Sequence, residues 1–159
     1  MKYRIISVGK IKEPFYRQGV NEYMKRLKSY GQFELIDGLE ERLDPEPAPK
    51  DIEHMLQKEA GKILNLLRPD ELVVALDIEG KNPDSRQLAD LVRQWNESGR
   101  PRVNFVIGAS YGLSPDMKQR ADYRLSFSSL TFAHQLAVLM LVEQLYRSFR
   151  ILHHEPYHK

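Results

Sequence analysis

The sequence predicts an α/β domain in which helices flank a mostly parallel β-sheet. Segments with strand-like and helix-like spacing alternate along the whole chain, which is typical of layered α/β domains. Two strand segments, Leu72–Leu76 (LVVAL) and Val103–Ile107 (VNFVI), are almost continuously apolar, as strands buried on both faces of a parallel sheet are. The chain has 159 residues, the length of one domain, so we expect residues 1–159 to form a single domain.

The first quarter of the chain predicts two strands around a helix. Tyr3–Val8 has the composition of a strand, and Gly9 ends it. Glu13–Lys28 places apolar residues at helical spacing opposite a charged face. Phe33–Ile36 predicts a second strand. Residues 40–49 are acidic and contain three prolines, which exclude helix and ladder pairing and predict an extended surface loop.

The middle of the chain continues the alternation. A helix is expected over Asp51–Leu67, ended by the Arg-Pro-Asp that follows, and the strand Leu72–Leu76 comes next. A further helix runs through Trp95, with Asp84 or Ser85 as its N-cap.

The last third predicts two strands and two helices. The strand Val103–Ile107 is followed by the tight loop Gly108–Gly112. Ser114 is an N-cap followed by proline, which predicts a short helix to about Ala121. Tyr123–Phe127 predicts the last strand, and a helix begins at about His134.

This last helix is apolar almost all round through Val142, which is typical of a buried helix. The hydroxyl-rich turn Ser128–Thr131 precedes it, and its backbone groups could bind a ligand. An ordinary turn before a core helix explains the same pattern. Because ligands bind outside the carboxyl ends of parallel strands, we expect a site where the chain leaves Leu76, Ile107 and Phe127.

The charge is nearly balanced, with 24 Lys and Arg against 22 Asp and Glu. Bases predominate in residues 1–28 and acids in residues 31–60, so the basic segment is a candidate contact face for polyanions, and a solvated surface is the alternative. No cysteine is present, which excludes disulfides and thiolate chemistry. Without an apolar leader or a run of about 18 apolar residues, we expect a soluble, cytoplasmic protein with no membrane association.

Two motifs could indicate chemistry. Gly108–Gly112 (GASYG) matches the nucleophile elbow G-x-S-x-G, which would make Ser110 the nucleophile of a serine hydrolase, with Asp116 or Asp122 and His134 downstream. A glycine-rich turn near a ligand or strand is the alternative. Three histidines near the C-terminus match no metal-ligand spacing, so we expect no metal. The closing Tyr-His-Lys suits stacking on a base and neutralising a phosphate.

Taken together, six segments make the chain resemble a known family: YRIISVGKIKE, LVVALDIEGK, VNFVIGASYGLSP, LSFSSLTFAHQ, EQLYRSFRI and PYHK. The family is that of ribosomal RNA large-subunit methyltransferase H, which belongs to the trefoil-knotted SPOUT methyltransferases. The resemblance implies a homodimer with a C-terminal trefoil knot. It also implies S-adenosylmethionine as cofactor and, as substrate, the N3 atom of a pseudouridine in large-subunit (23S) ribosomal RNA within the ribosome.

The resemblance also implies site residues. It assigns cofactor binding to three strand-end segments, namely Leu76, Gly108 and the run Phe127, Ser128, Ser129, Leu130, Thr131 and Phe132. It assigns the catalytic site to Tyr157 and His158, with the tail of a partner subunit completing the RNA site. We expect His158 either to act as a base or to orient the target base, and the alternative is that the pair only stacks on or hydrogen-bonds RNA. Candidate substrate contacts are His134, Arg147, Lys10, Arg17 and Lys25, with Lys12 and Arg26 in the same basic segment.

The chain departs from the family pattern at four positions. Ala109 replaces a glycine, Tyr111 a small polar or acidic residue, Ala133 a proline, and Val138 an arginine of the last helix. A valine cannot supply the anion contact that an arginine supplies. A knotted protein that binds cofactor or ribosome with impaired catalysis is therefore the alternative function.

Overall fold

The computed structural model describes residues 1–159. Five strands and five helices follow one another along the chain: β1 (Lys2–Ser7), α1 (Pro14–Leu27), β2 (Gln32–Asp37), α2 (Pro49–Leu64), β3 (Leu72–Lys81), α3 (Ser85–Glu97), β4 (Val103–Ile107), α4 (Pro115–Arg120), β5 (Tyr123–Leu125) and α5 (His134–Leu152). The strands form one sheet in the order β2-β1-β4-β3-β5, and every neighbouring pair is parallel. The predicted fold class is confirmed, and the sheet is parallel throughout.

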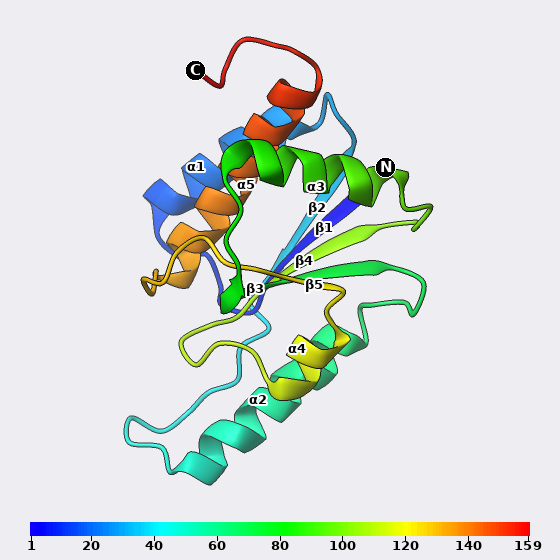
Figure 1. The fold of residues 1–159 in the computed structure, drawn as a ribbon. Helices are drawn as coiled ribbons and strands as arrows, with labels where there is room; N and C mark the ends of the chain where they lie inside the picture. The colour runs from blue at the N-terminus through cyan, green and yellow to red at the C-terminus, as the bar shows by residue number, and fades with distance from the viewer.

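Helices cover both faces of the sheet. Figure 1 shows α1, α3 and α5 on one face and α2 and α4 on the other. Each face buries its own apolar cluster: Phe105 and Leu141 belong to the cluster under α1, α3 and α5, and Val106 and Met117 to the one under α2 and α4. The side chains of β4 alternate between the two clusters, as the two-residue repeat of a strand requires. The central strands are therefore buried on both faces.

Local signals set most element ends as predicted. Asp84 caps α3 by accepting a hydrogen bond from the Gln87 N–H at 2.8 Å, and Ser114 accepts one from the Met117 N–H at 3.2 Å. The predicted helix Asp51–Leu67 is corrected to Pro49–Leu64, because proline fits the first position of a helix. Residues 40–48 form no helix or strand, as the prolines predicted.

The prediction for β3 is wrong in length. Instead of ending at Leu76, the strand continues to Lys81 and turns around β5, so that Leu125 pairs with both Leu76 and Lys81. The Ser126 N–H then donates to the Lys81 carbonyl at 2.7 Å. The predicted strand Tyr123–Phe127 accordingly stops at Leu125. The chain thus leaves the sheet between two segments of the same strand, just before the hydroxyl-rich turn.

The prediction of a buried last helix is confirmed along one side of α5. Val138, Leu141, Val142 and Leu145 are completely buried, and no residue of α5 is fully exposed. None of the helices, α5 included, is both long enough and apolar enough to span a membrane.

Gly80 is a point of backbone contact and provides a stability test. A Cβ on Gly80 would lie 2.5 Å from the Arg124 carbonyl oxygen and 2.9 Å from that of Asp77, whereas a Cβ on Gly61 in α2 would meet nothing within 4 Å. We expect Gly80→Ala to lower the free energy of unfolding by about 1–3 kcal/mol through overpacking. Gly61→Ala should raise it by about 0.5–1 kcal/mol through helix propensity. Urea denaturation measures both, and equal effects would contradict a tight crossing at Gly80.

Candidate active site

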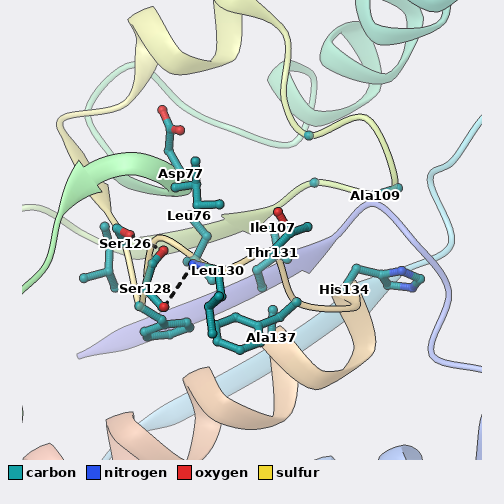
Figure 2. Close-up of a pocket in the computed structure, with 16 residues that line it drawn as sticks. Leu76, Asp77, Ile107, Ala109, Ser126, Ser128, Leu130, Thr131, His134 and Ala137 are labelled. Carbon is teal, nitrogen blue, oxygen red and sulfur yellow. Dashed lines mark hydrogen bonds between the residues drawn. The ribbon is translucent and has the colours of Figure 1, made fainter.

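A pocket lies where the chain leaves β3, β4 and β5, at the carboxyl edge of the sheet. Its walls come from three segments far apart in sequence together with the start of α5 (Figure 2). The hollow, counted with its open mouth, holds about 620 Å³. It is lined by Leu76, Asp77, Ile78, Ile107, Gly108, Ala109, Gly112, Leu125, Ser126, Phe127, Ser128, Leu130, Thr131, Phe132, His134 and Ala137. The three strand-end loops singled out from the sequence therefore meet in one place.

Seven of the eight residues predicted to bind cofactor line this pocket, and Ser129 does not. Sequence reasoning missed Asp77 and Ile78, which belong to the unpredicted extension of β3. It also missed Ala137, which stands one helical turn after Ala133 and so faces the loops from α5. A polar residue directly after a buried strand is a signal that could have indicated Asp77.

The loop between β5 and α5 leaves its backbone donors free. Between Phe127 and Phe132, the Leu130 N–H is the sole backbone donor with a protein acceptor, the Ser128 Oγ at 3.0 Å. The Ser128 carbonyl accepts from the Ser126 Oγ at 3.0 Å, which holds the turn in shape. Apolar walls with unpaired backbone N–H groups suit a ligand that has a flat apolar portion and a polar edge.

The one carboxylate in the pocket wall is neutralised. The side chain of Asp77 is 3% exposed, and it lies 3.2 Å from an Arg124 Nη1 and 3.6 Å from the Lys118 Nζ. Its Oδ1 also accepts the Glu79 N–H at 3.1 Å. A buried carboxylate needs such partners. Asp77 therefore ties the β3 extension to β5 and α4, rather than supplying a free charge to the pocket.

The GASYG motif is a turn, and the hydrolase hypothesis is wrong. The Gly112 N–H donates to the Ala109 carbonyl at 3.0 Å, and a Cβ on Gly108 would fall 2.5 Å from the Gly112 backbone. Ser110 forms no hydrogen bond with a histidine, while the His134 Nε2 lies 3.2 Å from the Lys10 carbonyl oxygen. No nucleophile and base are therefore paired, and the glycines are needed for close backbone approach.

The basic segment contains two kinds of cation. Arg17 lies 2.6 Å from Asp37 and also donates to the Ile11 carbonyl, so its guanidinium is used within the fold. Lys10, Lys12 and Lys25 are exposed and form no ion pair. Lys10 and Lys12 leave β1 beside the start of α5, whereas Lys25 lies in the last turn of α1. The structure therefore brings Lys10 and Lys12, but not Lys25, close to the pocket mouth.

The C-terminal tail folds back on α5. The Tyr157 hydroxyl donates to Glu143 at 3.0 Å and lies 3.2 Å from the Tyr23 hydroxyl. Arg147 donates to the same Glu143 at 2.8 Å, and its guanidinium carbon lies 4.7 Å from the Tyr157 ring centroid. Its other nitrogen, Nη1, lies 3.3 Å from the His158 Nδ1. The residues predicted to be catalytic thus form a cluster with Arg147.

This tail cluster is separate from the pocket of the same chain. Glu143 and Arg147 follow His134 by nine and thirteen residues on α5, which at 1.5 Å per residue is roughly 13–20 Å along the helix. Figure 1 shows the C-terminus beyond the far end of α5, away from the loops that form the pocket. Within one chain, the predicted catalytic and cofactor-binding residues are not brought together. No three potential metal ligands gather anywhere in the structure.

The fold and pocket are those of an α/β methyltransferase. The profile described as "Predicted SPOUT methyltransferase" matches residues 1–158, and the chain belongs to this family. Its relatives include "Ribosomal RNA large subunit methyltransferase H" of Syntrophomonas wolfei subsp. wolfei, 54% identical, and the protein of the same name from Bacillus pumilus, 46% identical. "Putative ribosomal RNA large subunit methyltransferase H" of Methanococcus maripaludis is 43% identical. Each alignment covers 100% of both chains.

Two solved structures share the fold at low sequence identity. A probable methylase family protein from Haemophilus influenzae Rd KW20 aligns with a TM-score of 0.53 and 15% identity, over 99% of this chain and 70% of that chain. A probable methyltransferase from Bordetella pertussis Tohama I aligns with a TM-score of 0.55 and 17% identity, over 92% and 95%. These similarities concern the fold alone.

The docking of the tail has an expected pH dependence. Burial, followed by the hydrogen bonds with Tyr23 and Glu143, raises the pKa of Tyr157 well above its usual value. A raised pKa means that docking favours the neutral phenol, so its contribution is complete below the free-tyrosine pKa of about 10 and is lost as the pH rises further. At pH 10, the difference in phenolate absorbance between the wild type and Tyr157→Phe should be well below half of the absorbance of one fully ionised tyrosine. A difference of one half would contradict a docked tail.

Proposed function

We propose that this chain transfers a methyl group from S-adenosylmethionine to N3 of a pseudouridine in large-subunit (23S) ribosomal RNA. The observation that carries the proposal is the full-length identity of 41–54% to relatives named as large-subunit ribosomal RNA methyltransferases H, combined with the pocket at the carboxyl edge of the sheet. We also propose that the 159 residues act as a single domain, and that the protein works in the cytoplasm, as a ribosomal RNA substrate supports.

The pocket residues fit S-adenosylmethionine, the methyl donor of SPOUT methyltransferases. Leu76, Ile107 and Phe132 provide apolar surface for an adenine ring, and the free backbone N–H groups of residues 127–132 can pair with the polar edges of the ligand. With Asp77 neutralised, the pocket wall carries no unpaired charge. When bound, the cofactor supplies an electrophilic methyl group on a sulfonium sulfur. Gly108 and the run 127–132, with Leu76, are the residues that hold it.

The turn of β3 around β5 supports a trefoil knot. Leu125 is paired on both sides by parts of β3, and the Asn82 Nδ2 donates to the Ser126 carbonyl at 2.8 Å. A chain that leaves the sheet between two segments of an earlier strand and then continues for 34 residues has the local arrangement that threading needs. The cofactor loop is then the threaded segment, held at its start by backbone contacts.

The separation of tail and pocket supports a homodimer in which the tail of one subunit completes the site of the other. Leu136 and Met140, one turn apart on α5, are only partly buried and do not belong to the side chains packed on the core. Phe15 of α1 is 63% exposed. These apolar groups on the α1 and α5 layer offer surface for a second copy.

The contact with Arg147 defines the role that we propose for His158. A guanidinium has only donors, so the His158 Nδ1 beside it is an acceptor and the proton of the neutral ring is on Nε2. His158 then donates a hydrogen bond from Nε2 to a carbonyl oxygen flanking the target N3. Such a donor stabilises the negative charge of the deprotonated base, while the N3 proton leaves to solvent. Arg147, held by Glu143, positions the ring.

Impaired catalysis is the alternative function, and Val138 is its best support. The side chain is completely buried in the core under α5, so it adds apolar packing where the family resemblance implies a cation. Methyl transfer to ribosomes, measured below, separates the two functions.

Leu130 provides a test of the cofactor pocket. It lines the pocket yet is 67% exposed, so a bound ligand should cover it while the free fold barely depends on it. We expect Leu130→Ala to raise the Kd for S-adenosylmethionine by about three- to tenfold, as measured by calorimetry, with an unchanged Tm. Leu64→Ala, at an exposed leucine of α2, is the matched control. An unaltered Kd in Leu130→Ala would place the cofactor elsewhere.

Labelled methyl transfer to assembled ribosomes that lack the modification tests the function directly. The label should map to one pseudouridine, where a methyl at N3 blocks base pairing and stops reverse transcription. Absence of label, or label at another kind of base, would overturn the proposal.

Variants of His158 test its role within that assay. We expect His158→Ala to lower kcat about 100-fold, the usual cost of losing such a donor. His158→Gln, which keeps an N–H near the position of Nε2, should stay within about tenfold of the wild type. If the glutamine variant is as slow as the alanine variant, His158 acts as a base.

A further inference from the structure

The segment between β1 and α1, residues 9–13, is held in place by side chains from the start of α5. The Gln135 Oε1 accepts hydrogen bonds from two consecutive backbone N–H groups, Lys12 at 2.9 Å and Glu13 at 3.0 Å. The preceding residue, His134, lies with its Nε2 3.2 Å from the Lys10 carbonyl oxygen. Three contacts therefore link neighbours on α5 to a segment more than 120 residues earlier in the chain.

Gly9 is what allows this close approach. A Cβ at this position would fall 2.3 Å from the His134 Nε2, so the ring occupies the space of a side chain. Figure 2 shows the His134 ring directed away from Thr131 and toward the segment that leaves β1. On its other side, the segment is held by Asp37, which accepts the Ile11 N–H at 2.9 Å. The backbone of residues 9–13 is thus fixed without belonging to a helix or strand.

The α5 end of this contact is continuous with the pocket wall. Thr131, Phe132 and His134 line the pocket, and Gln135 is the next residue. A ligand that fixes the loop 127–132 also fixes the first turn of α5. It thereby fixes the Gln135 Oε1, which accepts the N–H groups of Lys12 and Glu13. At the other end, Lys10 and Lys12 are exposed and unpaired, which leaves their ammonium groups available to phosphate.

We propose that Gln135, with His134, is a positioning residue that couples occupancy of the cofactor pocket to the placement of Lys10 and Lys12 on the RNA backbone. The contacts of Gln135 and His134 with residues 9–13, here called the tether, are a property of the fold, whereas their effect on RNA rests on the proposed function. Binding of cofactor makes the segment 9–13, which carries the lysines, more rigid. In turn, RNA bound by these lysines favours the arrangement of the loop 127–132 that binds cofactor. The two ligands then bind with positive cooperativity, which is reciprocal by linkage.

The matched pair for the test is Gln135→Met and Gln87→Met. Both remove a side-chain Oε1 that accepts a backbone N–H, but the second does so at the start of α3, where Gln87 pairs with Asp84. Neither change alters charge. The Tm of each variant shows that the chain remains folded.

Limited trypsin digestion measures how firmly the tether holds residues 9–13, and it does not require methyl transfer. Cleavage after Lys10 and Lys12, followed by mass spectrometry, should be about tenfold faster in Gln135→Met, since two backbone hydrogen bonds are lost, and unchanged in Gln87→Met. Adding S-adenosylmethionine should slow this cleavage in the wild type and not in Gln135→Met. Equal cleavage rates in all three proteins, or equal protection by the cofactor, would overturn the proposal even if methyl transfer is normal.

Kinetics on ribosomes then test the connection to RNA. Gln135→Met should raise KM for ribosomes about five- to tenfold with kcat nearly unchanged, because positioned phosphate contacts act in binding. Combined with Lys12→Met, the two changes should raise KM less than the product of their separate effects, since both act through one contact. Multiplicative effects, or a loss confined to kcat, would contradict positioning through Lys12. Failure of methyl transfer in the wild type would instead refute the proposed function and leave the digestion result standing.

Discussion

The pairing of Leu125 with two parts of β3 is the contact on which the rest of the site depends. Because β3 continues past Leu76 and pairs with β5 again at Lys81, the chain leaves the sheet at a residue that contacts both parts of β3. This exit aims residues 126–133 across the ends of β3 and β4 and delivers α5 to the opposite layer. Gly80 permits the crossing by bringing its backbone against the Arg124 carbonyl. Asp77, Arg124 and Lys118 then fix the turn electrostatically.

The helix α5 connects the pocket with the docked C-terminal tail. Its first turn belongs to the pocket through His134 and Ala137, and its later turns hold the tail through Glu143 and Arg147. One helix therefore sets the distance between the loop 127–132 and the tail. In the proposed dimer, a second copy would bring its own tail to this loop. The same helix start also contacts the β1–α1 segment, which carries the exposed Lys10 and Lys12.

The departures from the family pattern fall at positions with different physical meaning. Val138 is buried in the core, where valine adds packing and no charge. Tyr111 is exposed on the turn after β4 and does not line the pocket, whereas Ala109 lines the pocket and closes that turn through its carbonyl. Ala133 is the N-cap of α5 and makes no side-chain cap. The start of α5 is held instead by the contacts of its first two residues with the β1–α1 segment.

The sequence by itself determined the order of the elements, the parallel sheet and the edge where the pocket forms. Apolar periodicity, capping residues such as Asp84 and Ser114, and proline positions act over a few residues, so they can be detected locally. The tertiary structure decided the extension of β3, the partnership of Arg17 with Asp37, the docking of the tail and the Gln135 contacts. Each of these joins groups from distant parts of the chain or, as in β3, depends on a distant strand. Lys12 and Gln135 are 123 positions apart, and no local pattern encodes which of many polar side chains will meet once the sheet has brought their elements together.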